Sequence, residues 1–189
     1  MIQPWERVES ERLGEYTVFQ VRRDRSRSPR SGAAHTFHVI EATDWVNVIP
    51  VTPDGRFVFV RQYRHGIEAV TLEIPGGMID PGETPAEAAR REMHEETGYA
   101  AEQVLYLGGI APNPAIQNNV CHSYLALDVR PDGPPHLDGA EDIDVVLVDP
   151  ADVPPLVAAG SINHALVVTA FYLYEQYRRG VQGEEVRGP

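Results

Sequence analysis

One helix is delimited by the sequence at both of its ends, between Thr84 and Gly98. Thr84 can cap the first turn, Pro85 suits the first helical position because its missing N–H has no partner there, and Glu87 completes a T-x-x-E capping box. Gly98 can adopt the left-handed conformation that ends a helix. The sequence therefore predicts a helix from about Pro85 to Thr97.

The predicted helix carries three glutamates close together near its end. Glu92 and Glu96 are one turn apart and project from the same face, with Glu95 beside them. Like charges at this spacing destabilise a helix by roughly 0.2–0.5 kcal/mol per pair. A divalent cation would remove the repulsion, and carboxylate oxygens suit Mg²⁺ or Mn²⁺. The alternative is an acidic helix surface in contact with solvent only.

Apolar segments before and after this helix predict strands, and the last part of the chain predicts two more helices. The expected strands are residues 46–51, 56–64, 70–74, 104–107, 122–129 and 144–148. A short helix is expected to start within 149–155, and a longer one to span 164–179. No internal repeat and no linker divides this part of the chain, so we expect one domain over residues 45–180 and a disordered tail over 181–189.

Residues 1–44 are interpreted as a basic extension that contains an antiparallel β-hairpin. Residues 16–23 and 35–41 alternate like strands, whereas residues 22–32 are rich in Arg, Ser and Pro and predict a long loop. Seven of the 16 arginines lie before residue 31. This concentration of charge indicates either a solvated loop or a contact with a second subunit.

The basic side chains are all arginine, because the chain contains no lysine. Schiff-base chemistry, a Walker-type phosphate lysine and a lysine general base are therefore excluded. Acidic residues outnumber arginines by 28 to 16, which gives a net charge of -12 and argues against nucleic acid as a partner. Any phosphate binding must use arginine, backbone N–H groups or metal ions.

The setting expected for this chain is the cytoplasm. Cys121 is the only cysteine, so no intrachain disulfide can form. Residues 1–13 are polar and lack the apolar region of a secretion signal. No apolar run approaches the length that spans a bilayer, so we expect no membrane partner.

Residues 77–99 match the pattern G-x5-E-x7-R-E-U-x-E-E-x-G-U, where U is bulky and apolar. The fixed positions are Gly77, Glu83, Arg91, Glu92, Glu95, Glu96 and Gly98. Seven such positions coincide by chance about once in 10⁸ windows at average residue frequencies. The segment resembles the box of the Nudix hydrolases, with Tyr99 at a position where that family more often has an aliphatic residue.

The resemblance implies a loop and helix that bind divalent ions, Mg²⁺ or Mn²⁺, with a diphosphate between them. It implies metal-binding roles for Glu92 and Glu96, a further and more variable role for Glu95, a supporting role for Glu83, and a metal ligand in the carbonyl of Gly76. It also implies that Arg91 orients the glutamates by ion pairing. Arg91 and Glu95 are thus candidate catalytic residues.

The segments that flank the box resemble the ADP-ribose pyrophosphatase branch and its relatives that act on nucleoside diphosphate sugars. The resemblance rests on residues 61–64, 72–77 and 160–165, with Pro114 fifteen residues beyond the box. It implies an α/β/α sandwich with a mixed sheet, preceded by the N-terminal antiparallel hairpin, and a homodimer. The implied reaction converts ADP-ribose to AMP and ribose 5-phosphate. GDP-mannose, another nucleotide sugar, a dinucleoside polyphosphate, or nucleotide sensing without turnover are the alternatives.

In this branch a glutamate on a late loop often serves as general base or as an extra metal ligand. The resemblance therefore implies Glu141, with Asp142 or Asp144 as substitutes; an acidic surface turn is the alternative. The residues expected to bind substrate are Arg61, Arg64, Glu73, Pro114, Gln117 and Asn118. The two arginines can bind phosphate or form structural ion pairs, and the two amides can bind sugar hydroxyls or cap loop backbone. The scattered histidines, among them His164, are interpreted as structural because none has a partner at metal-binding spacing.

Overall fold

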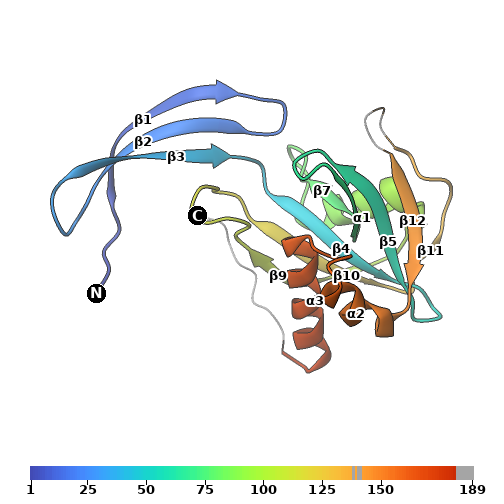
Figure 1. Ribbon diagram of the computed structural model, residues 1–189. Helices are drawn as coiled ribbons and strands as arrows, with labels where there is room; N and C mark the ends of the chain where they lie inside the picture. The colour runs from blue at the N-terminus through green and yellow to red at the C-terminus, as the bar shows by residue number, and fades with distance from the viewer. Residues whose placement is uncertain (138, 140–141, 182–189) are drawn as a thin grey trace. The chain divides into compact units, whose positions relative to one another are not determined.

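The computed structural model describes residues 1–137, 139 and 142–181 (Figure 1). The chain divides into two compact units: the first comprises Met1–Thr43 and Ala111–Val120, and the second comprises Asp44–Ile110 and Cys121–Pro189. Two predictions lie outside the described residues, namely the general base Glu141 and nearly all of the tail over 181–189.

The first unit is built on an antiparallel sheet of β1 (Glu6–Glu15), β2 (Gln20–Arg27) and β3 (Ala34–Glu41), in that order. The predicted antiparallel pairing is confirmed for β2 and β3. The sequence reading missed β1, and it was wrong to begin a loop at residue 22, because β2 continues to Arg27.

Exposed ion pairs explain why β1 was not recognised from its sequence. Arginines of β2 pair with glutamates of β1 across the sheet, in the pairs Arg27–Glu6 at 3.4 Å, Arg25–Glu9 at 3.7 Å and Arg23–Glu11. Opposite charges on neighbouring strands stabilise a sheet, but β1 then lacks the apolar alternation that marks a half-buried strand.

The second unit contains a mixed sheet in the order β12-β5-β4-β10-β9, with β6 paired to β5 and β7 paired to β4. Its strands are β4 (Trp45–Val51), β5 (Phe57–Arg64), β6 (Ala69–Glu73), β7 (Gly76–Met78), β9 (Val104–Ile110), β10 (Cys121–Leu127) and β12 (Ile143–Val148). Strands β4 and β10 run parallel, and the other pairs are antiparallel. A separate two-stranded ladder joins β8 (Tyr99–Ala100) to β11 (Arg130–Pro131).

Helices cover both faces of this mixed sheet. Helix α1 (Pro85–Thr97) packs Met93 against Val48 on one face, while α3 (Ala165–Arg178) packs Val167 into the cluster of Ile49 on the other. Val48 and Ile49 are consecutive in β4, so their side chains serve opposite faces. This arrangement, an α/β/α sandwich, agrees with the expected fold.

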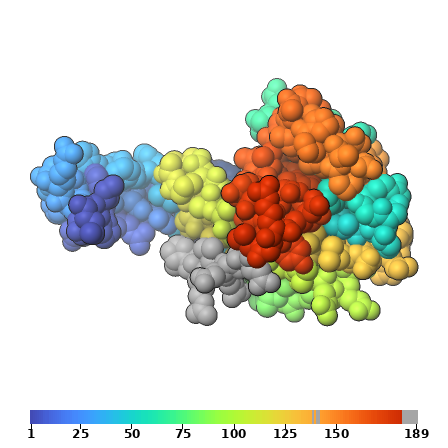
Figure 2. All heavy atoms as spheres, turned by 90° about the horizontal axis from the view of Figure 1, so that it is seen from below, coloured from blue at the N-terminus to red at the C-terminus, as the bar shows by residue number. Residues whose placement is uncertain are grey.

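The second helical layer also includes a 3₁₀ turn at Pro150–Asp152 and α2 (Val153–Ala158). In Figure 2, α3 (red) and the segment just before it (orange) lie together on one side of the second unit. Within the described ranges, no helix is long and apolar enough to cross a membrane.

Candidate active site

Helix α1 begins and ends at the predicted residues. The Thr84 hydroxyl accepts a hydrogen bond from Glu87 N at 3.3 Å, and the Glu87 carboxylate accepts one from Thr84 N at 2.8 Å. Gly98 ends the helix with φ 69°, in the left-handed region. Because both ends are fixed, the glutamates of the last turns are held at defined positions relative to β7.

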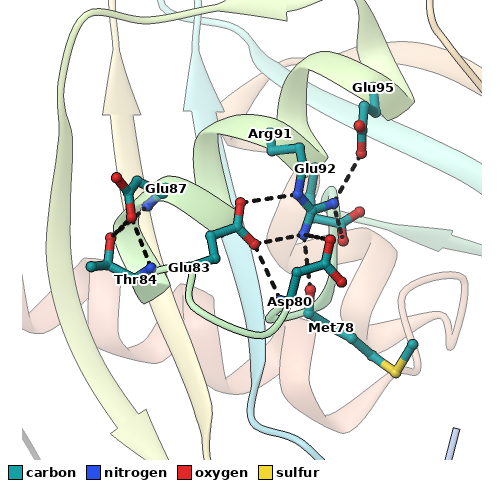
Figure 3. Close-up of polar contacts among 8 residues, drawn as sticks. All are labelled: Met78, Asp80, Glu83, Thr84, Glu87, Arg91, Glu92 and Glu95. Atoms are coloured by element: carbon teal, nitrogen blue, oxygen red, sulfur yellow. Dashed lines mark hydrogen bonds and ion pairs between the residues drawn. The ribbon is translucent and has the colours of Figure 1, made fainter.

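The guanidinium of Arg91 lies among three carboxylates of the box (Figure 3). Its Nε and Nη2 donate to the two oxygens of Glu83 at 3.0 and 2.9 Å. Its Nη1 donates to Glu92 at 2.9 Å and to Glu95 at 3.0 Å. Nη2 also donates to the Met78 carbonyl at 3.0 Å, so one side chain ties the helix to the loop before it.

The contacts between Arg91 and Glu83 favour the ionised forms of both side chains. The hydrogen bonds from Arg91 hold the pKa of Glu83 below its ordinary value, and the bond to Glu83 is the main cause of the raised pKa of Arg91. The Glu83 side chain is only 16% exposed, so the ion pair is largely shielded from solvent. Arg91 therefore forms ion pairs with Glu83, Glu92 and Glu95, and its bonds to Glu83 favour the ionised form of that glutamate.

Glu96 and Glu92 approach the glycines of β7 closely. Glu96 is 4% exposed, and its carboxylate accepts a hydrogen bond from Gly76 N at 3.0 Å. A Cβ at Gly77 would lie 2.4 Å from Glu92 Oε1, and one at Gly76 would lie 2.3 Å from the Val46 carbonyl oxygen. Close packing against backbone thus requires Gly76, whereas a side chain at Gly77 would displace the Glu92 carboxylate from its place beside bare backbone.

The donor atoms at this place suit a hard divalent cation. Four glutamate carboxylates and the backbone carbonyls of β7 supply oxygen only, which is the preference of Mg²⁺ and Mn²⁺. In the part of the chain that the structure describes, no three acidic, histidine or cysteine side chains form a ready metal-binding group, and the guanidinium of Arg91 lies among the carboxylates. The residues present fit such an ion in two ways. Their donor atoms are all oxygen, and the glycine backbone beside Glu92 carries no side chain that would fill the space next to the carboxylate.

Arg64 is engaged in an ion pair with a buried glutamate. Its Nε and Nη2 each donate to Glu73 at 2.8 Å, and the Thr71 hydroxyl donates to the same carboxylate at 2.6 Å. Glu73 is 2% exposed; burial alone would raise its pKa, but these hydrogen bonds outweigh burial and lower it. Of the two alternatives for Arg64, the structure contains the ion pair. Arg61 lies 3.6 Å from Asp144, and both side chains are exposed.

The other candidates for substrate binding belong to the first unit, whereas the box belongs to the second. The Asn118 side chain accepts a hydrogen bond from Ala42 N at 3.2 Å, so it caps loop backbone. Gln117 forms a parallel bridge with Ile40, and Pro114 belongs to the same segment. Glu141 lies outside the described residues.

Sequence reasoning missed Asn47, which links the box to α3. Asn47 is 6% exposed, pairs with Gly76 across β4 and β7, and donates from Nδ2 to the Leu166 carbonyl at 3.4 Å. The sequence does signal this residue, because it places a single amide within an apolar strand. A buried amide needs a specific hydrogen-bond partner, so such a residue is a candidate for a structural contact.

Comparisons with known proteins agree with this geometry. The family model described as NUDIX domain matches residues 42–171. The ADP-ribose pyrophosphatase of Bacillus subtilis (strain 168) is 28% identical over 156 residues, which cover 82% of this chain and 84% of that protein. The ADP-sugar pyrophosphatase of Mus musculus is 31% identical over 163 residues, which cover 76% of this chain and 74% of that protein.

A solved structure shares the fold. The crystal structure of an ADP compounds hydrolase superposes with a TM-score of 0.83 at 24% sequence identity, and the match covers 95% of this chain and 97% of that one. The family match spans most of the chain and includes the whole carboxylate cluster around Arg91. The chain therefore belongs to the Nudix family and is a Nudix hydrolase.

Proposed function

We propose that this enzyme hydrolyses the diphosphate linkage of a nucleoside diphosphate sugar, with ADP-ribose as substrate and AMP and ribose 5-phosphate as products. The observation that carries the proposal is the carboxylate cluster, in which Arg91 binds Glu92 and Glu95 while Gly76 N–H binds Glu96. The names of the relatives, which act on ADP-ribose and ADP-sugars, support the choice of substrate.

The cofactor that we propose is Mg²⁺ or Mn²⁺, held by Glu92 and Glu96 with help from Glu95, Glu83 and the Gly76 carbonyl. Such an ion, when bound, neutralises the charge of a diphosphate and lowers the pKa of water. In this proposal Arg91 directs Glu83, Glu92 and Glu95 toward one region, a role that its hydrogen bonds to these carboxylates support. The residue that removes a proton from the attacking water is proposed to be Glu141.

The proposed substrate-binding residues remain Arg61, Arg64, Glu73, Pro114, Gln117 and Asn118. Arg64 and Glu73 would act as a pair, because the guanidinium uses Nε and Nη2 on the carboxylate and leaves Nη1 for a phosphate or sugar oxygen.

Product analysis tests the reaction and its substrate together. The enzyme is incubated with ADP-ribose, GDP-mannose, UDP-glucose and diadenosine polyphosphates, with magnesium and with a chelator in its place. AMP release from ADP-ribose that stops in the chelator supports the proposal, whereas faster cleavage of another substrate identifies that one instead. Full activity in Glu92→Gln or Glu96→Gln would contradict the metal-binding roles.

We further propose a cytoplasmic homodimer in which the first unit contacts a second copy. Trp5 and Phe37 are each 44% exposed and meet edge to face at 5.5 Å between ring centroids, which supports an interface there. Sedimentation at micromolar concentration tests this, and a monomer would contradict it.

A further inference from the structure

Two polar side chains lie next to each other in the middle of the mixed sheet. Asn47 and Ser123 are direct partners in the parallel ladder of β4 and β10. Asn47 is 6% exposed and Ser123 is fully buried. Ile49 and Leu125, two positions further along these strands, pack in the same apolar cluster as Val167 of α3. Because side chains alternate along a strand, Asn47 and Ser123 face α3 as well.

Each of these side chains has a buried oxygen that makes no hydrogen bond. Within the described residues, three buried side-chain atoms lack a partner, and two of them are Asn47 Oδ1 and Ser123 Oγ. The orientation of the amide is fixed, because Nδ2 of Asn47 donates to the Leu166 carbonyl and Oδ1 cannot take its place there. Native proteins pair most buried polar atoms with protein or ordered water. Two unpaired oxygens at adjacent positions therefore indicate a shared partner.

In this row of the described sheet, no other side chain can supply the missing hydrogen bonds. Asn47 pairs on its other side with Gly76 of β7, and Ser123 pairs with Gly108 of β9, and neither glycine has a side chain. The next row on this face carries three large apolar side chains, namely Ile49, Leu125 and Leu105. Asn47 and Ser123 together fill less space than the first two of these. A small space lined by polar groups suits a water molecule.

We propose that Asn47 and Ser123 bind one buried water molecule between the sheet and the first turn of α3. The water donates one hydrogen bond to Asn47 Oδ1, and a second bond joins it to Ser123 Oγ, which can donate or accept. With the bond from Nδ2 to Leu166, the water connects β4, β10 and α3. This inference goes beyond the proposed reaction and does not depend on it.

A crystal structure of the wild-type chain tests the site directly. We expect one isolated solvent peak at about 2.5–3.2 Å from both Asn47 Oδ1 and Ser123 Oγ. A direct hydrogen bond between these two oxygens overturns the proposal, and so does the absence of any peak that contacts both of them.

Thermal denaturation of Ser123→Ala gives opposite results for an occupied and a dry site. If water bridges the two side chains, loss of the hydroxyl leaves Asn47 Oδ1 poorly paired, and Tm should fall by about 2–12 °C. If the site is dry, Ser123 Oγ is a buried polar atom without a partner, so its removal should leave Tm unchanged or raise it. That second result overturns the proposal. Ser161→Ala, which removes an exposed hydroxyl shortly before α3, is the matched control and should leave Tm unchanged.

Discussion

Replacing Arg91 by methionine removes one guanidinium and leaves three carboxylates around the space it filled. The lost contacts are two hydrogen bonds to Glu83, one each to Glu92 and Glu95, and one to the Met78 carbonyl, all between 2.9 and 3.0 Å. Methionine keeps most of the side-chain volume, so the effect reports charge and hydrogen bonding. Stability should fall, because the carboxylates then repel one another without compensation.

The size of the loss follows from burial. Removing one partner of a fully buried ion pair costs about 3–5 kcal/mol, while exposed pairs are worth about 0–1 kcal/mol. Arg91 is 28% exposed, with Glu83 at 16%, Glu92 at 13% and Glu95 at 41%. We therefore expect an intermediate loss of about 2–3 kcal/mol, which lowers Tm by about 4–12 °C for a chain of this size.

Thermal denaturation at low ionic strength, with and without magnesium chloride, measures the loss of stability and shows whether repulsion between the carboxylates causes it. Magnesium should stabilise Arg91→Met more than the wild type, because a cation can replace the guanidinium among the carboxylates. Arg90→Met is the matched control, since it removes the same charge from the same helix. If Arg91→Met is as stable as Arg90→Met, or gains no more from magnesium than the wild type, the role assigned to Arg91 is refuted.

Three further outcomes are expected. Thr84→Ala removes half of the capping box and should cost about 1 kcal/mol in urea denaturation; an unchanged midpoint would contradict the capping role. Gly77→Ala places a methyl group 2.4 Å from the original position of Glu92 Oε1, so the carboxylate must move. The magnesium-dependent kcat should fall by roughly tenfold or more. Wild-type activity in this variant would contradict the role of Glu92. The pKa values of Glu83 and Glu73 are lowered in the folded state, so their stabilisation is present above the ordinary carboxyl pKa and is lost as the pH falls through the lowered values. Tm should therefore drop below about pH 4, and Glu73→Gln with Glu83→Gln should flatten that drop; an equally steep drop would rule out these two groups.

Local interactions allowed the box helix to be predicted to the residue. The cap at Thr84 and Glu87 and the left-handed Gly98 each act within a few positions of the chain. Spacing on a helix also placed Glu92, Glu95 and Glu96 within about one turn. The sequence was therefore sufficient for the family and for the orientation of the cluster.

The N-terminal sheet shows where local reading fails. Strand β1 is stabilised by glutamates whose arginine partners lie on β2, and β1 itself shows no apolar period. Pairing of this kind depends on register between two segments, so a window of sequence that contains only one strand carries no sign of it.

By itself the sequence determined the box helix, its carboxylates and the mixed α/β class, because these follow from spacing along one segment. Only the tertiary structure decided that Arg64 binds the buried Glu73 and that Asn47 joins Gly76 to α3. Each of these contacts joins different secondary-structure elements, and Asn47 and Leu166 are 119 positions apart. Such partners are chosen by how strands and helices pack, and packing is a property of the whole second unit.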